Sequence, residues 1–162
     1  MSTIIPRRVF LTKGMGQHKE KLASLEQALR QAGIAPFNLV KVSSIFPPGC
    51  KVVPRDVGIR LLKPGQILFL VMSENATNEA HRLISAAIGL AVPNDPRHYG
   101  YLSEHHSFGQ TEREAGDYAE DLAAEMLATT LGRNISDIKD IWDEKKKIYR
   151  ISDKLTVKAR NI

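Results

Sequence analysis

The segment VKVSSIFPPGC at residues 40–50 limits the possible folds most, because it leaves no room for a helix. The run FNLVKV that leads into it favours a strand. Pro47 and Pro48 restrict the residues before them to extended backbone, so the chain cannot continue into a helix after this strand. The sequence therefore predicts a strand that ends at Ser43 and Ser44 and leaves through a stiff, extended exit.

Hydrophobic periodicity predicts the other elements. Leucines at helical spacing indicate a helix over residues 18–32 that ends at Gly33. Thr111 and Glu114 form a capping-box pattern at the start of a second helix over residues 111–131. Strands are expected at residues 8–12, 66–73, 83–92 and 99–106, with a hairpin between KIYRI and LTVKA. This order predicts an α/β fold, a layered sandwich of mixed or antiparallel β-sheet flanked by helices, in a single domain.

The composition limits the cellular compartment. Cys50 is the single cysteine, which excludes an internal disulfide framework and favours a reducing compartment. The longest apolar run, ILFLVM at residues 67–72, is too short to cross a bilayer. The amino-terminal residues lack the apolar core of a signal peptide. We therefore expect a cytoplasmic protein without a membrane partner.

A net charge of +5 and a pI of about 9.4 raise the question of a nucleic-acid partner. The basic residues are scattered along the chain, and aromatic residues make up only 6% of it, so a base-stacking surface is not expected. A mildly basic, solvated surface is the favoured interpretation, and no nucleic acid is expected as a partner.

Three short motifs allow chemistry but have simpler interpretations. The GMG segment at residues 14–16 lacks the Lys-Ser/Thr ending of a phosphate loop and favours a plain strand-to-helix turn. On a strand, Glu104 and His106 would share one face and His105 the other, and the remaining histidines lack ligand spacing, so no metal site is predicted. Cys50 has no neighbour in the sequence that lowers a thiol pKa, which favours an inert thiol.

For Ser43, Ser44 and Glu104, a chemical interpretation competes with a structural one. Serines often end strands because their hydroxyls bind loose backbone groups, and a lone glutamate is most often a surface acid. In the chemical interpretation, the stiff exit aims a serine hydroxyl at a peptide carbonyl, and Glu104 acts as an acid or base in a cleft. Residue types alone favour the structural interpretation.

Taken together and in order, these motifs resemble a known family. The segments that carry the resemblance are ASLEQALRQAGIAPFNLVKVSSIFPPGC at 23–50, ISAAIGLAVP at 84–93 and GYLSEH at 100–105. With order and spacing kept over most of the chain, they are similar to the pyruvoyl-dependent arginine decarboxylases. The resemblance implies the layered decarboxylase fold. It also implies homo-oligomers of αβ units, as trimers or dimers of trimers, with active sites between neighbouring subunits.

The resemblance implies that residues 1–162 are cut between Ser43 and Ser44 into a β chain, 1–43, and an α chain, 44–162. The Ser44 hydroxyl would attack the Ser43 carbonyl carbon. Elimination and hydrolysis would then leave a covalent pyruvoyl group derived from Ser44. This group would serve as the electron sink that pyridoxal phosphate provides elsewhere. Neither pyridoxal phosphate nor a metal is therefore expected.

By the same resemblance, Glu104 is the catalytic acid and Glu26 is the substrate-binding carboxylate. Glu104 would return a proton to the α-carbon after CO2 leaves, and a protonated carboxyl is favoured by an apolar site. Glu26 stands on the first helix where archaeal members carry aspartate, and its carboxylate would bind the substrate guanidinium through two oxygens. The implied reaction converts L-arginine to agmatine and CO2, for polyamine synthesis or acid consumption.

Two other interpretations stay open. One is a pyruvoyl decarboxylase for another basic amino acid, such as histidine or ornithine, which CO2 release across basic amino acids would identify. The other is a non-catalytic, oligomeric ligand-binding protein of the same fold. That protein would keep the Ser43–Ser44 peptide intact, and its mass would be that of the full chain.

Overall fold

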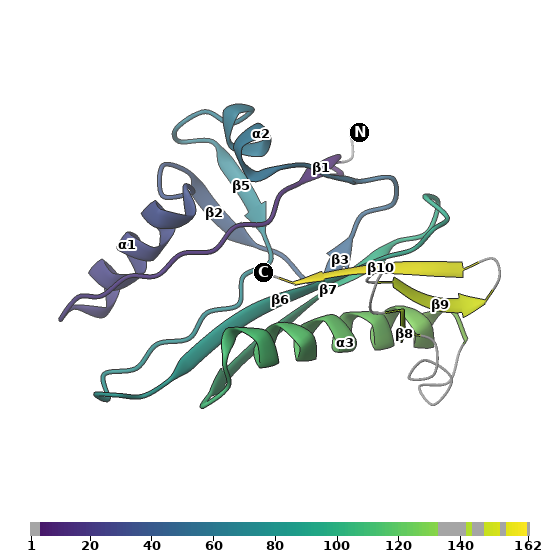
Figure 1. Cartoon of the computed structure of the whole chain (residues 1–162). Helices are drawn as coiled ribbons and strands as arrows, with labels where there is room; N and C mark the ends of the chain where they lie inside the picture. The colour runs from purple at the N-terminus through teal and green to yellow at the C-terminus, as the bar shows by residue number, and fades with distance from the viewer. Residues whose placement is uncertain (1–3, 133–141, 144–147, 153–154, 162) are drawn as a thin grey trace. The chain divides into compact units, whose positions relative to one another are not determined.

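The computed structural model describes residues 4–132, 142–143, 148–152 and 155–161 (Figure 1). The chain forms two compact units, one made of residues 1–42 and 50–70 and the other of residues 43–49 and 71–162. It passes from the first unit to the second between Val42 and Ser43. The serine pair therefore sits at a junction of the chain rather than inside one long element.

The first unit combines short parallel strand pairs with two helices. Its elements are β1 (Arg8–Val9), α1 (Lys21–Ala32), β2 (Asn38–Lys41), β4 (Lys51–Val52), α2 (Arg55–Arg60) and β5 (Ile67–Leu70). β1 pairs with β4 and β2 pairs with β5, both in parallel. Each pair joins one strand from before the serine pair to one strand from after it.

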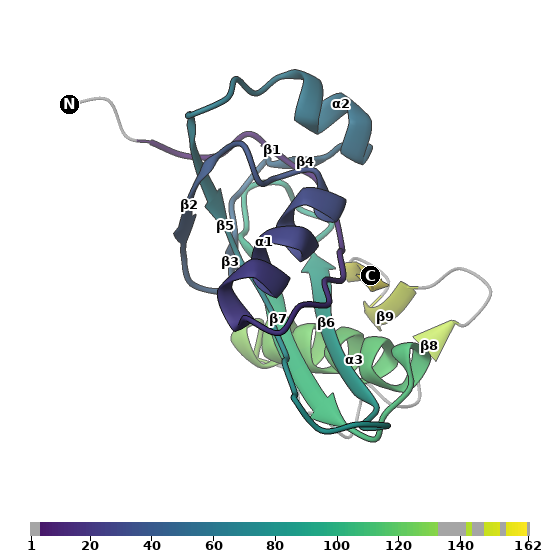
Figure 2. The same ribbon diagram turned by 90° about the vertical axis from the view of Figure 1, so that its left-hand side faces the viewer.

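Residues from two other segments close the carboxyl end of α1, which belongs to the same unit as α2 (Figure 2). Gly33 ends the helix in the left-handed conformation, with a φ of 80°, as predicted. Arg55 donates hydrogen bonds to the carbonyl oxygens of Ala32 and Gln31, both at 3.2 Å. Thr12 Oγ1 donates to the Ala32 oxygen at 2.6 Å. A cation at this end also suits the helix dipole, so Arg55 stabilises α1 from α2.

The GMG segment runs closely along α1. A Cβ on Gly14 would lie 2.0 Å from a helix carbonyl oxygen and one on Gly16 would lie 1.9 Å from another, so glycine alone permits this approach. The backbone N–H groups of Met15 and Gln17 donate to glutamine side chains of α1. Because these donors are already used, the segment serves as a packed connection between strand and helix, in agreement with the prediction.

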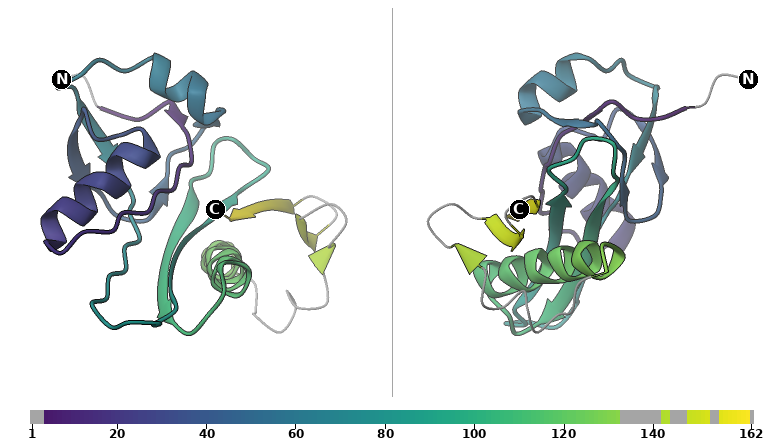
Figure 3. Two further views of the ribbon diagram at one scale, coloured as in Figure 1. Left: turned by 60° about the vertical axis from the view of Figure 1, so that its left-hand side comes forward. Right: turned by 90° about the vertical axis from the view of Figure 1, so that its right-hand side faces the viewer.

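The second unit is an antiparallel sheet with one long helix. Its elements are β3 (Ile45–Phe46), β6 (Ile84–Val92), β7 (Gly100–Phe108), α3 (Glu112–Thr130), β8 (Trp142–Asp143), β9 (Ile148–Ser152) and β10 (Leu155–Asn161). The strand order is β3-β7-β6-β10-β9-β8, and every neighbouring pair is antiparallel. The left panel of Figure 3 looks nearly along α3, which lies against one face of β6 and β7.

Small residues line the contact between α3 and the sheet. The buried alanines of this contact are Ala87, Ala91, Ala115, Ala119, Ala123, Ala124 and Ala128. A Cβ on Gly89 would lie 1.9 Å from the Ala119 carbonyl oxygen, so β6 comes very close to the helix backbone. Ser103 Oγ donates a hydrogen bond to the same oxygen. This packing fixes which residues of β6 and β7 face the helix and which face away.

The main elements of the second unit match the predictions. β6 and β7 confirm the strands at 83–92 and 99–106, and β9 and β10 pair as the predicted hairpin. Thr111 and Glu114 cap α3 reciprocally, as the capping box requires. The mixed α/β class, with an antiparallel sheet packed on a helix, is confirmed, whereas β3, β4, α2 and β8 were not predicted. Across the described ranges, no helix has the length and apolarity to cross a membrane.

Candidate functional site

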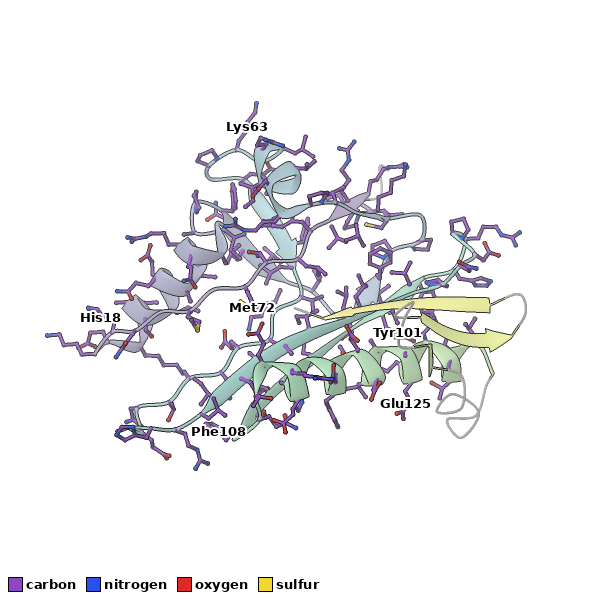
Figure 4. The ribbon with its side chains drawn as sticks, viewed as in Figure 1. His18, Lys63, Met72, Tyr101, Phe108 and Glu125 are labelled. Carbon is purple, nitrogen blue, oxygen red and sulfur yellow. The ribbon has the colours of Figure 1, made fainter. Side chains whose placement is uncertain are left out.

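β7 presents its residues alternately to α3 and to the opposite face of the sheet. Tyr101 and Phe108, both labelled in Figure 4, lie near its two ends. On the helix side, the ring of His105 lies 4.3 Å from the ring of Tyr118. Glu104 is adjacent in the strand and belongs to the other face. The prediction that Glu104 and His105 point to opposite faces is confirmed.

The serine pair leads directly into β3 and is tied to β7. Ile45 and Phe46 pair with β7, and Phe46 is only 2% exposed, which anchors this short strand in the core. One residue before β3, the carbonyl oxygen of Ser44 accepts a hydrogen bond from the N–H of Leu102 at 2.8 Å. Ser44 is half-buried and Ser43 is exposed. The β3–β7 pairing therefore fixes the position of Ser44.

The peptide between the two serines is flanked by backbone hydrogen bonds. The carbonyl oxygen of Ser43 accepts a hydrogen bond from the N–H of Ile45 at 2.9 Å, which makes a three-residue turn centred on Ser44. On the other side, the N–H of Val42 donates to the carbonyl oxygen of Leu70 at 2.9 Å. The carbonyl that cleavage would attack thus already has a donor from its own chain.

Glu104 lies diagonally across the β3–β7 pair from Ser44. Leu102 is hydrogen-bonded to Ser44, and Glu104 follows two residues later, about 7 Å further along an extended strand. Diagonal neighbours at this spacing are within reach of a long side chain. Glu104 is exposed in the single chain. The structure therefore brings together the predicted cleavage residue and the predicted acid.

Side chains from the segment before β6 hold the half of β7 that carries Glu104. Ser73 Oγ donates to the carbonyl oxygen of His105 at 2.6 Å, and Asn75 Nδ2 donates to that of Ser107 at 2.8 Å. These contacts fix the backbone just after Glu104. The sequence offered no signal for them, because Ser73 ends the predicted strand 66–73 and Asn75 belongs to a segment, 74–81, with the composition of a polar turn.

Glu26, the predicted guanidinium ligand, belongs to the first unit and is already paired with a guanidinium. Arg30 Nη2 donates to both Glu26 carboxylate oxygens, at 2.7 and 2.6 Å, and Nε donates to one of them at 3.2 Å. The hydrogen bonds that Arg30 makes to Glu26 raise the pKa of Arg30. The attraction between the two charges is the second cause of this rise. The two side chains are 47% and 72% exposed, so this is a weak, solvated pair. The i,i+4 spacing of acid and base could have predicted it.

Cys50 is a half-buried free thiol. Burial raises its pKa, and a hydrogen bond with the backbone of Lys51 lowers it by less, so the net shift is upward. A raised pKa leaves less thiolate at neutral pH, which agrees with the prediction of an inert thiol.

Comparison with known proteins identifies the family. The family model for pyruvoyl-dependent arginine decarboxylase (PvlArgDC) matches residues 8–161. The chain is 56% identical over 153 residues to a probable pyruvoyl-dependent arginine decarboxylase of Chlorobium limicola, covering 94% of this chain and 84% of that protein. It is 58% identical over 149 residues to the pyruvoyl-dependent arginine decarboxylase of Methanococcoides burtonii, covering 92% and 82%. Pyruvoyl-dependent arginine decarboxylase 2 of Methanosarcina mazei is also 58% identical, with coverage of 92% and 81%. The chain therefore belongs to the pyruvoyl-dependent arginine decarboxylase family.

Proposed function

We infer that this chain decarboxylates L-arginine to agmatine and CO2 with a covalent pyruvoyl group. The reaction follows from the family, whose model covers residues 8–161. The assignment of residues rests on one observation, the hydrogen bond from the Leu102 N–H to the Ser44 carbonyl oxygen, because it sets the serine pair beside Glu104. The single cysteine, Cys50, supports a reducing, cytoplasmic location.

Ser44 is the residue that becomes the pyruvoyl group when the chain is cut into a β chain, 1–43, and an α chain, 44–162. The group fits this position, because it has fewer heavy atoms than a serine residue and keeps the carbonyl that Leu102 holds. Once formed, it supplies a ketone that binds the substrate amine and withdraws electrons as CO2 leaves. β3 and Leu102 orient Ser44, and Glu104 delivers a proton from the neighbouring position on β7.

The working form is a homo-oligomer of αβ units, a trimer or dimer of trimers, in which neighbouring copies complete the site. A protonated carboxyl at Glu104 is favoured by an apolar environment, yet Glu104 is exposed in the single chain. The first unit also exposes apolar side chains of β2 and β5 on one side, such as Ile67 at 58% and Phe69 at 42%. Burial of such surfaces against another copy stabilises an assembly. The proposal also includes the finer fold, a layered sandwich of mixed or antiparallel β-sheet flanked by helices.

Glu26 binds the guanidinium of arginine, so Glu26→Ala should raise the KM for arginine by about 10- to 100-fold. This range corresponds to the loss of one hydrogen-bonded charge pair. Self-cleavage should proceed normally, because the serine pair needs no guanidinium ligand. Steady-state kinetics on the processed variant, with the processed fraction measured by mass, checks both effects.

Arg30→Ala is the matched control for Glu26→Ala. It removes the same ion pair from α1 but leaves the Glu26 carboxylate free, so the KM should stay the same or fall. An equal rise of the KM in both variants would mean that the pair only supports the helix. A loss of self-cleavage in Glu26→Ala as severe as its loss of substrate affinity would also remove Glu26 from the binding role.

The intact mass of the purified wild-type chain tests the proposed cleavage. We expect two fragments that end at Ser43 and begin at Ser44, with the larger one blocked by a pyruvoyl group. CO2 release should then be measured with arginine, ornithine and histidine. A full-length mass after long incubation would support the ligand-binding interpretation, and preference for another basic amino acid would replace arginine as the substrate.

A further inference from the structure

In the turn at Ser44, the carbonyl group of Ser43, which cleavage would attack, accepts a hydrogen bond from the backbone two residues later. The N–H of Ile45 lies 2.9 Å from the carbonyl oxygen of Ser43. Among the described residues, His81 is the only one other than glycine with a positive φ, so the turn is of the inverse γ type. In the uncut chain, this distance is that of an ordinary N–H···O hydrogen bond to the carbonyl oxygen.

Self-cleavage develops negative charge on this same oxygen. The Ser44 hydroxyl oxygen bonds to the Ser43 carbonyl carbon, and the π electrons of the carbonyl move onto the Ser43 oxygen. When the carbonyl re-forms, the peptide bond to the Ser44 nitrogen breaks, and the hydroxyl proton ends on that nitrogen. The product is an ester between Ser43 and the Ser44 side chain. Loss of the Ser44 α-proton then expels the Ser43 carboxylate, and water releases ammonia.

We propose that the backbone N–H of Ile45 stabilises the negative charge on the Ser43 oxygen during the first step of self-cleavage. This role rests on the proposed cleavage between Ser43 and Ser44. A donor already aligned in the uncut chain needs no reorganisation when the charge appears, which is the condition under which such donors are most effective. The same hydrogen bond withdraws electron density from the carbonyl carbon and favours attack by Ser44.

The pairing of β3 explains why the Ile45 N–H is available for this role. Ser44 uses its carbonyl oxygen to bind β7, and hydrogen bonds to a neighbouring strand come from alternate residues. Ile45 therefore directs its N–H away from β7 and towards the Ser43 oxygen. Phe46, which is buried, holds Ile45 in this register. The donor is thus fixed by strand pairing on one side and by core packing on the other.

Replacement of single backbone amides by esters tests the proposal. The α-hydroxy acid that corresponds to isoleucine is introduced at residue 45 by nonsense suppression in cell-free translation, which removes the N–H and keeps the side chain. Conversion of the full chain into fragments 1–43 and 44–162 is followed over time on a denaturing gel, with masses for identification. We expect cleavage about 10²- to 10³-fold slower than with isoleucine at residue 45.

Two further esters serve as controls. An ester at Phe46 removes a neighbouring backbone N–H that belongs to the β3–β7 ladder, and an ester at Gly109 removes the donor to the Leu83 carbonyl oxygen beyond the other end of β7. Each costs one ordinary hydrogen bond, so cleavage should slow by less than about tenfold. The ester at residue 45 also makes the Ser44 α-proton more acidic, so the elimination step is not the one that slows.

The outcomes separate this proposal from the proposed cleavage itself. Slow cleavage only in the Ile45 ester supports the role of the Ile45 N–H. Cleavage of the Ile45 ester at the rate of the isoleucine chain, or equal slowing in all three esters, overturns it and leaves the cleavage site in place. A wild-type chain that is never cut between Ser43 and Ser44 overturns both.

Discussion

Ser44→Ala is expected to leave a single uncut chain that releases no CO2 from arginine. Alanine has no oxygen to attack the Ser43 carbonyl carbon and no leaving group on Cβ, so neither the ester nor the elimination product can form. The loss should be complete, because without a pyruvoyl group the protein has no ketone to bind the substrate amine. Intact mass, followed by CO2 release at saturating arginine, measures both consequences.

Ser43→Ala is the matched control for this variant. Ser43 supplies only its carbonyl, and alanine supplies the same carbonyl, so the chain should still be cut and should still decarboxylate arginine. Because Ser43 is exposed, the substitution also disturbs little packing. A Ser44→Ala protein that still acts on arginine would refute the pyruvoyl mechanism, and failure of both variants to cleave would point to a general loss of the local fold.

Glu104→Gln is expected to reduce kcat by about 10²- to 10⁴-fold, the range that a positioned acid contributes. Glutamine keeps the size of the side chain and its place diagonally across from Ser44, but it has no proton to give to the α-carbon. Self-cleavage should be complete, because the donor on the Ser43 oxygen comes from the backbone. Activity per pyruvoyl group, counted from the mass of the larger fragment, is the quantity to compare.

Glu79→Gln provides a control for the loss of one negative charge from the same unit. Glu79 is an exposed residue that forms a solvated ion pair with Arg82 at 3.7 Å, and such a pair contributes little. It should match the wild-type kcat. Wild-type kcat in Glu104→Gln would assign the proton to another group, whereas loss of self-cleavage in that variant would give Glu104 a structural or processing role.

The elements that could be predicted from the sequence are those long enough for their own residues to show a cap or a hydrophobic period. The capping box and the alanine-rich face of α3 both lie within one continuous stretch of the sequence. The helix and its start could therefore be predicted. The run LISAAIGLAV at 83–92 fits more than one period, yet its small and branched residues and the following proline correctly indicated the strand β6. Short elements such as β3 and β4 carry two residues each, which is too few for any period to appear.

The site could be predicted only as separate residues, because long-range register brings them together. The run VSSIF carries no signal that it pairs with β7. A shift of one residue in the register of this pairing would place the Ser44 side chain on the other face of the sheet. The prolines alone do not hold the serines in place. Phe46 in the core and the Leu102 hydrogen bond do so, and both depend on strands that are distant in the sequence.

The proposed cleavage between Ser43 and Ser44 would divide each parallel strand pair of the first unit between two fragments. β1 and β2 would then belong to the fragment 1–43, whereas their partners β4 and β5 would belong to the fragment 44–162, as would Arg55 of α2, which binds a carbonyl oxygen at the end of α1. Contacts that formed within one molecule become contacts between two. The cleaved protein would therefore unfold by dissociation, with a melting temperature that rises with protein concentration. Folding of the uncut chain would be a first-order process, whereas refolding of the separated fragments would be second order, so after cleavage recovery of the fold would depend on reassembly.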